Sequence, residues 1–188
     1  MKRILTLLLI VLSTSLLAQT SKKIDIEKST LEWKGYKITG HHEGTIRFSD
    51  GVLIFNESDK TKLIGGYFVV NMTTIVCTDL STGAKERLER HLKDKDFFDV
   101  ENHQYAMLNF SQIKTNANGT HTVVADMEIK GIKQSITFDI KVLENNASAT
   151  LVIDRTKHDI KFRSESLFPE LADKAIKDNF DISVKLVF

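Results

Sequence analysis

Apolar and polar residues alternate with a period of two along most of this chain. The alternation is clearest over residues 123–130, 136–142 and 182–188, where every second residue is apolar. A period of two places these apolar residues on one face of a β-strand and leaves the other face polar. Turn sequences such as Asn118-Gly119 separate the runs and indicate hairpins. Roughly eight to ten such strands in antiparallel meander order predict an all-β protein.

A sheet with one apolar face must close on itself or pack against a second sheet. The proline content favours closure, because Pro169 is the single proline and lies outside the clear strands. A barrel of roughly eight strands has an interior that side chains can fill or that can hold one ligand. Strands of nine or ten residues would span about 30 Å, so an interior cavity would be long and narrow.

Three local patterns in the first half of the chain predict details of the sheet. Asp50-Gly51 lies between two apolar alternations and predicts a hairpin that joins residues 45–48 to residues 52–55. Residues 41–44 predict the turn after the first strand. The apolar parity changes within residues 63–76, which predicts a β-bulge near Thr73-Thr74.

Helical spacing is found in residues 85–100. Leu88 and Leu92 lie four positions apart among charged residues, and Phe97 and Phe98 follow directly. We therefore expect one short helix over residues 84–94, between strands, that places these four apolar side chains against the sheet. Such a helix would gate an interior channel, or it would simply cover an open end of the core.

The first 18 residues are typical of a secretory signal peptide. Lys2 and Arg3 precede an apolar run that is too short for a stable membrane anchor, and cleavage is expected after Ala18. Loss of these two cations changes the formal charge from +1 to −1, which gives no electrostatic reason to expect nucleic-acid binding. Residues 19–188 are predicted to form a single periplasmic or secreted domain.

The residue types that carry catalysis or bind metals show no recognised pattern. The sequence lacks a G-x-S-x-G elbow, an H-E-x-x-H helix and a glycine-rich phosphate loop. Cys77 is the single cysteine, and its alternating surroundings favour a buried structural thiol. Adjacent His41 and His42 side chains diverge, so a metal site would need His91 or His158 folded nearby. We therefore predict a protein that is not an enzyme and has no metal or cofactor.

The parity of the strands predicts what faces the barrel interior. Phenylalanine dominates the aromatic residues, with eleven Phe against three Tyr and one Trp. Because Phe has no polar atom, such a lining suits a flexible hydrocarbon. A second interpretation is that these side chains meet and fill the barrel as an ordinary core. The predicted channel residues are Trp33, Tyr36, Phe48, Phe68, Val70, Met72, Leu88, Leu92, Phe97, Phe98, Phe110, Met127, Phe138, Leu151 and Leu186.

A series of short motifs lies in order along residues 23–188, namely Trp33-Lys34-Gly35, residues 40–46, Gly51, and residues 66–70, 87–93, 96–99, 129–132 and 153–155. Together these motifs resemble the YceI-like family. The resemblance implies a lipocalin-like antiparallel up-and-down β-barrel with one short α-helix, often dimeric, in the periplasm. It also implies non-enzymatic binding, transport or storage of a polyisoprenoid or other long-chain amphiphilic lipid, including quinone-related isoprenoids. One departure is His103-Gln104, where the family often has Tyr-Pro.

A polar head group on such a lipid would need hydrogen-bond donors at the channel mouth. The cations predicted to contact it are Arg87 and Arg90 on the helix and Arg155 at the end of a later strand. Alternatively, the helix arginines pair with neighbouring glutamates in solvent, and Arg155 forms a structural pair with Asp154. A function of another class also fits the pattern, namely a filled barrel that acts in envelope stress or protein interaction without a lipid.

Overall fold

The computed structural model describes residues 19–188, so the predicted signal peptide lies outside the described residues. The all-β prediction with one short helix is confirmed. The elements are β1 (Gln19–Lys23), β2 (Thr30–Lys37), β3 (Gly40–Asn56), β4 (Leu63–Cys77), α1 (Thr82–Lys93), β5 (Tyr105–Thr115), β6 (Thr120–Ile129), β7 (Ile132–Val142), β8 (Asn146–Asp154), the 3₁₀ helices η1 (Arg155–His158) and η2 (Pro169–Lys174), and β9 (Ile176–Val187).

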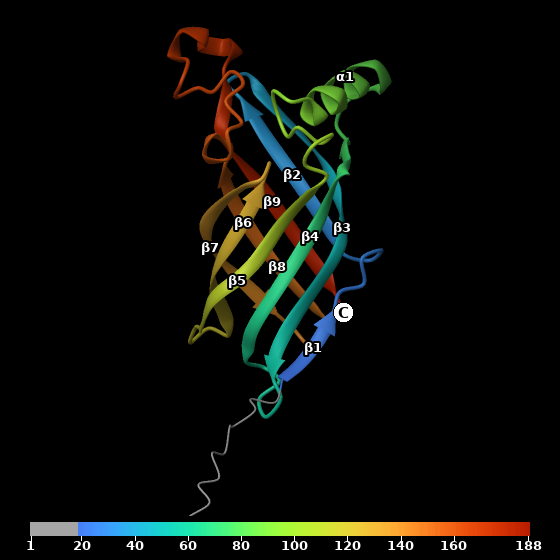
Figure 1. Cartoon of the computed structure of the whole chain (residues 1–188), viewed down its shortest axis with the longest axis vertical. Coiled ribbons are helices and arrows are strands. Elements are labelled where there is room, and N and C mark those ends of the chain that lie inside the picture. The colour runs from blue at the N-terminus through green and yellow to red at the C-terminus, as the bar shows by residue number, and fades with distance from the viewer. Residues whose placement is uncertain (1–18) are drawn as a thin grey trace, which may run out of the picture.

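Strands β2 to β9 close into an antiparallel barrel. Their order is β3-β2-β9-β8-β7-β6-β5-β4, and the pairing of β3 with β4 completes the ring. Strand β1 pairs with the last part of β3. Closure gives the barrel strands hydrogen-bonding partners on both sides. Figure 1 shows α1 and η2 at one end and the β3–β4 and β5–β6 turns at the other. We call these the helix end and the hairpin end.

The predicted hairpin at Asp50-Gly51 is wrong, because β3 runs through both residues as one strand of 17 residues. Its pairing with β4 shifts between Phe48 and Asp50, so the two residues lie at an irregularity in the ladder. Gly51 is needed there, since a Cβ would lie 2.6 Å from the ring of Phe68. The Asp50 carboxylate accepts a hydrogen bond from the Tyr67 hydroxyl at 2.9 Å.

The other local predictions had mixed outcomes. The turn predicted at residues 41–44 is wrong, because Lys37 pairs with Gly40 and the turn is Ile38-Thr39. The bulge near Thr73-Thr74 is confirmed, because the β3–β4 pairing shifts there and the Thr74 hydroxyl accepts a hydrogen bond from the Arg47 N–H at 2.9 Å. The hairpin at Asn118-Gly119 is confirmed between β5 and β6.

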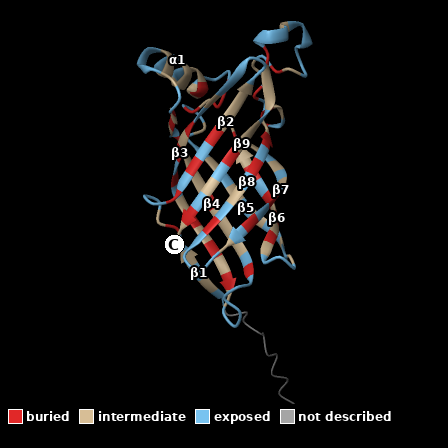
Figure 2. Ribbon diagram, turned by 180° about the vertical axis from the view of Figure 1, so that it is seen from behind, coloured by how far each residue is buried: buried red, intermediate tan, exposed pale blue. Residues whose placement is uncertain are grey.

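The hairpin end of the barrel is a filled core. Leu53 and Val123 have no exposed surface, and Phe55 and Leu63 are almost fully buried. These residues come from the last part of β3 and the first parts of β4 and β6. Figure 2 shows buried positions alternating with exposed positions along the strands. The predicted alternation of inward and outward residues is therefore observed.

Helix α1 and the segment after it lie over the helix end. Leu92 is buried and Leu88 packs partly buried against the core. The helix spans Thr82–Lys93, which agrees with the predicted residues 84–94 to within two residues at each end. The last helical carbonyls then hold the following segment, because the Phe98 N–H donates to the Leu92 carbonyl at 3.1 Å. This contact fixes the backbone that carries Phe97 and Phe98.

Candidate ligand channel

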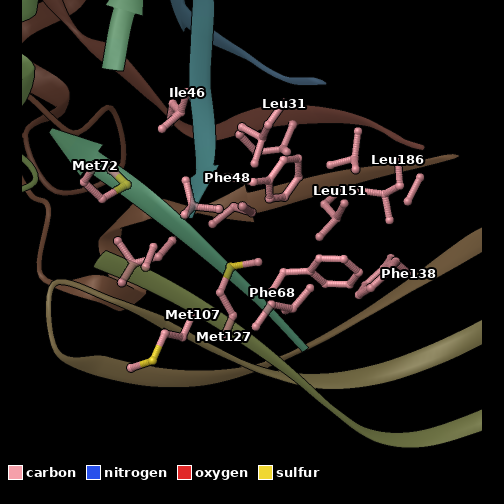
Figure 3. A pocket seen from close by; sticks show the side chains of 18 of the residues that line it. Leu31, Ile46, Phe48, Phe68, Met72, Met107, Met127, Phe138, Leu151 and Leu186 are labelled. Atoms are coloured by element: carbon pink, nitrogen blue, oxygen red, sulfur yellow. The ribbon is translucent and has the colours of Figure 1, made fainter. Parts of the chain in front are cut away.

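The main cavity lies inside the barrel and has a volume of about 110 Å³. Every residue that lines it is Ala, Val, Leu, Ile, Met or Phe. Figure 3 shows Ile46 and Met72 toward one end of this lining and Phe138 and Leu186 toward the other. Because an unpaired polar group would lose its hydrogen bonds to water here, the lining favours hydrocarbon and disfavours polar ligands.

Strand parity identified a large part of this lining. Parity also held for residues that the sequence analysis did not select, such as Ile182 and Val184, which share the alternation of Leu186. Ala106 and Leu108 likewise share the parity of Phe110. The predicted residues found in the main cavity are Phe48, Phe68, Val70, Met72, Phe98, Phe110, Met127, Phe138, Leu151 and Leu186.

A smaller cavity of about 70 Å³ lies at the helix end. Four predicted residues absent from the main cavity line it, namely Trp33, Tyr36, Leu92 and Phe97. Phe98 lines both cavities, as do Ile46, Phe180 and Ile182. Of the predicted channel residues, only Leu88 lines neither cavity. The segment after α1 therefore supplies part of the channel wall as well as its cover.

A chain of aromatic contacts ties this cover to the barrel. His91 packs edge-on against Phe162 and Phe97, with ring centroids 4.5 and 5.5 Å apart. Phe97 contacts Phe98 at 5.2 Å, and Phe98 contacts Phe180 of β9 at 6.4 Å. Edge-to-face packing of this kind is favourable beyond the buried area alone. The cover is thus joined both to β9 and to the loop between β8 and β9.

Four phenylalanines form a row across one side of the interior, which we call the Phe row. Phe48, Phe68, Phe110 and Phe138 project from β3, β4, β5 and β7, and successive ring centroids are 6.0, 5.8 and 5.9 Å apart. All four rings line the main cavity. The two interpretations of the interior therefore apply to different parts of the barrel, which is filled at the hairpin end and open nearer the helix end.

Arg155 is buried, with only 2 % of its surface exposed. Burial lowers the pKa of its guanidinium, an effect that the carboxylate of Asp178 at 3.7 Å opposes. Four hydrogen bonds of 2.8 to 3.1 Å occupy most of its five N–H groups. Although Arg155 lines the small cavity, these bonds favour a structural role. The acceptors are the carbonyl oxygens of Ile160, Phe162, Ile176 and Lys177.

The two helix arginines lie elsewhere. Arg87 and Arg90 are exposed on α1 and line neither cavity. Arg90 borders a shallow outer groove whose other lining residues include Glu86 and Glu89. The structure therefore does not bring the three arginines together around one cavity, and contact of any of them with a lipid head group stays a prediction.

Charged residues that the sequence analysis did not select, Asp181 and Lys177, lie beside the small cavity. The Tyr36 hydroxyl donates to the Asp181 carboxylate at 2.6 Å, and this bond, with burial, raises the pKa of Tyr36. Lys177 also lines the cavity and pairs with Glu165 at 2.7 Å. Neither pair could be predicted from the sequence, because each joins residues that only the fold brings together.

Cys77 is a buried free thiol, as predicted. Its Sγ donates to Asp79 at 2.9 Å, and burial raises the pKa of the thiol. Burial would also raise the pKa of Asp79, but hydrogen bonds from Cys77, His42 and the Glu43 N–H outweigh it and lower that pKa to about 2. The cluster therefore stabilises a charged aspartate and an uncharged thiol.

Asp79 should contribute about 1–2 kcal/mol to stability at neutral pH, after allowance for its partial exposure. Its pKa in the folded protein is about 2, below the ordinary 3.8, so the contribution is complete above about pH 4 and is lost as the pH falls toward 2. Urea unfolding of wild type and Asp79→Asn should differ by this amount at pH 6 and converge near pH 2. The exposed Asp173→Asn serves as control, and a pH-independent difference for Asp79→Asn would contradict the assignment.

Within residues 19–188, the candidate metal ligands do not come together. In this part of the chain, no three His, Cys, Asp or Glu side chains are grouped to hold a metal ion. His158, one of the candidate ligands, is buried and its Nδ1 is 3.0 Å from the Ile132 carbonyl. No helix in the same residues is sufficiently long and apolar to cross a membrane.

The fold and the channel together define a class of protein. Eight antiparallel strands closed around an apolar interior, with one short helix over an end, form a lipocalin-like barrel. Within that class, the chain belongs to the YceI-like domain family, because the model of that family matches residues 23–188. The resemblance seen in the sequence motifs is thereby confirmed.

Solved structures share this fold. BcnA from Burkholderia cenocepacia has a TM-score of 0.71 at 18% identity, and the match covers 88% of this chain and 99% of BcnA. A polyisoprenoid binding domain from Saccharophagus degradans has a TM-score of 0.56 at 14% identity, with 90% and 97% covered. The YceI protein of Campylobacter jejuni has a TM-score of 0.54 at 14% identity, with 75% and 82% covered. At these identities the similarity concerns the fold.

A curated relative shows similarity in sequence. The UPF0312 protein of Serratia proteamaculans is 30% identical over 100 residues, which are 53% of this chain and 48% of that protein. The chain thus matches about half the length of this relative.

Proposed function

We propose that this protein binds a polyisoprenoid or another long-chain amphiphilic lipid in its barrel and carries or stores it in the periplasm, without catalysing a reaction. Isoprenoid quinones and their precursors are within the proposed ligand class. The observation that carries the proposal is the wholly apolar lining of the main cavity. The YceI-like family and the name of the Saccharophagus degradans domain support it. We also propose that residues 1–18 are cleaved on export and that the protein has no resident cofactor. Assembly into a homodimer is a further part of the proposal.

Binding of a long chain requires movement of the lining. The main cavity, at about 110 Å³, is comparable with an apolar cavity of roughly 150 Å³ that holds benzene. A longer hydrocarbon therefore has to displace side chains. Met72 and Met127 line the cavity, and methionine adapts easily because it is unbranched and has three rotatable bonds. Their presence supports a channel that widens around its ligand.

The direct test is native mass spectrometry of the protein purified from the periplasm of its own host, followed by organic extraction. We expect a stoichiometric long-chain lipid, and its mass identifies the ligand class. A protein that carries no lipid and also refuses polyisoprenoids added in detergent would contradict the proposal. That result would favour the filled barrel with protein partners.

Phe138→Trp should weaken lipid binding by at least about tenfold while it changes stability by less than about 1 kcal/mol, because the added ring enters the cavity. Phe55→Trp is the matched control, since Phe55 is buried in the filled core and lines neither cavity. Overpacking there should cost about 1–3 kcal/mol and leave binding unchanged. Binding is measured by displacement of a fluorescent fatty acid, and stability by urea unfolding. A large stability loss in Phe138→Trp with unchanged binding would count against the channel.

A further inference from the structure

We infer that the channel is a blind tunnel that takes one hydrocarbon chain from the helix end, and that Ala149 marks the depth that limits chain length. The inference rests on the proposed lipid binding and adds the direction and the length of the bound chain.

The cavity extends toward the helix end. Ala106, which shares the inward parity of Leu108 and Phe110, lines it and is partly exposed. This residue lies at the start of β5, which is the helix-end part of that strand. At the other end, Leu53 and Val123 have no exposed surface and close the barrel. A chain can therefore enter beside β5 but cannot leave through the hairpin end.

The lining of β9 gives the length of the tunnel. Phe180, Ile182, Val184 and Leu186 all line the cavity, and six residue steps separate the first from the last. Six steps span about 20 Å along a strand, or about 15 Å along the axis of a barrel with ordinary strand tilt. The hydrocarbon core of a bilayer is about 30 Å thick, so a chain within one leaflet also spans about 15 Å. The tunnel thus matches one membrane-length chain, and a longer chain must fold back or leave part outside.

Small side chains stand at both ends of this tunnel. Ala149 lies toward the hairpin end of β8, and its ladder partners Ile140 and Val184 also line the cavity. Ala106 holds the corresponding place at the helix end, opposite Val70 of β4. A leucine at either position would occupy tunnel space without altering the filled core. At Ala149 it would shorten the tunnel, and at Ala106 it would narrow the entrance.

The test measures affinity for prenols of increasing length, by displacement of cis-parinaric acid from the purified protein in detergent. For the wild type, we expect affinity to rise at least about tenfold per isoprene unit from geraniol through farnesol to geranylgeraniol, because each buried methylene strengthens binding. Solanesol should bind no tighter than geranylgeraniol. Ala149→Leu should lose at least about tenfold for geranylgeraniol and less than about threefold for farnesol. Ala106→Leu should weaken all four by a similar factor.

The outcomes separate the inference from the function on which it rests. Continued tightening from geranylgeraniol to solanesol, or an equal loss for every prenol in Ala149→Leu, would overturn the tunnel limit while leaving lipid binding intact. A wild type that binds none of the prenols overturns both. Thermal unfolding of both variants verifies folding, and Ala149→Val, which adds less volume, replaces Ala149→Leu if the larger side chain prevents folding.

Discussion

Replacing Arg155 with methionine should lower the free energy of unfolding by about 3–5 kcal/mol, because the buried carbonyl acceptors and Asp178 lose their partner. For a chain of this size, the melting temperature should fall by about 10 °C. Methionine keeps much of the apolar stem, so the loss reports on the guanidinium. Urea unfolding monitored by circular dichroism measures it. Arg87→Met, on the exposed face of α1, is the control and should change stability by less than about 0.5 kcal/mol.

The same variant tests the role that the sequence suggested for Arg155. Its guanidinium lies 5.7 Å from the centre of the Phe97 ring, so its loss should also loosen the cover of the channel. Amide exchange in residues 94–100 should accordingly become faster. If Arg155→Met instead kept full stability and lost affinity for geranylgeranyl phosphate but not for geranylgeraniol, the residue would be a head-group contact and the structural assignment would be wrong.

Local turn signals predicted some connections and failed at others for a physical reason. Asn118-Gly119 forms a hairpin because β5 and β6 have nothing else to pair with beyond it. Asp50-Gly51 carries a similar signal, yet β3 continues through it. There, β3 pairs with β4 along most of its length, with β2 before the dipeptide and with β1 after it. The hydrogen bonds of these three ladders outweigh the preference of two residues for a turn.

Parity could identify inward residues but could not show whether they leave free space. Phe55 and Phe68 both face inward, yet Phe55 lies in the filled core and Phe68 lines the main cavity. The difference depends on the side chains that meet from distant strands, and no local pattern records their summed volume. Arg155 was unpredictable for a related reason, because its acceptors lie in two separate segments that only the closed barrel brings together.

The second large effect is expected at Gly44. A Cβ there would lie 1.9 Å from the carbonyl oxygen of Val76 and 2.8 Å from the ring of Trp33, closer than such atoms can approach. Because the first obstacle is backbone, a small side-chain movement cannot relieve it. Gly44→Ala should therefore cost about 3 kcal/mol or more, the upper part of the range for overpacking. Urea unfolding measures the loss.

Gly35 on the adjacent strand is the matched control for Gly44, since a Cβ there would meet no atom within 4 Å. Gly35→Ala should change stability by less than about 0.5 kcal/mol.

Trp33 is the single tryptophan, so its fluorescence reports on this site separately from global unfolding. In the wild type its Nε1 donates to the Val76 carbonyl at 3.1 Å, and displacement of the ring in Gly44→Ala should move the emission toward that of exposed tryptophan. Equal stability and unchanged emission in the two variants would contradict the close approach. If the expected difference is found, the glycine of the 40–46 motif serves to seat Trp33 in the wall of the small cavity, which links this motif to the shape of the channel mouth.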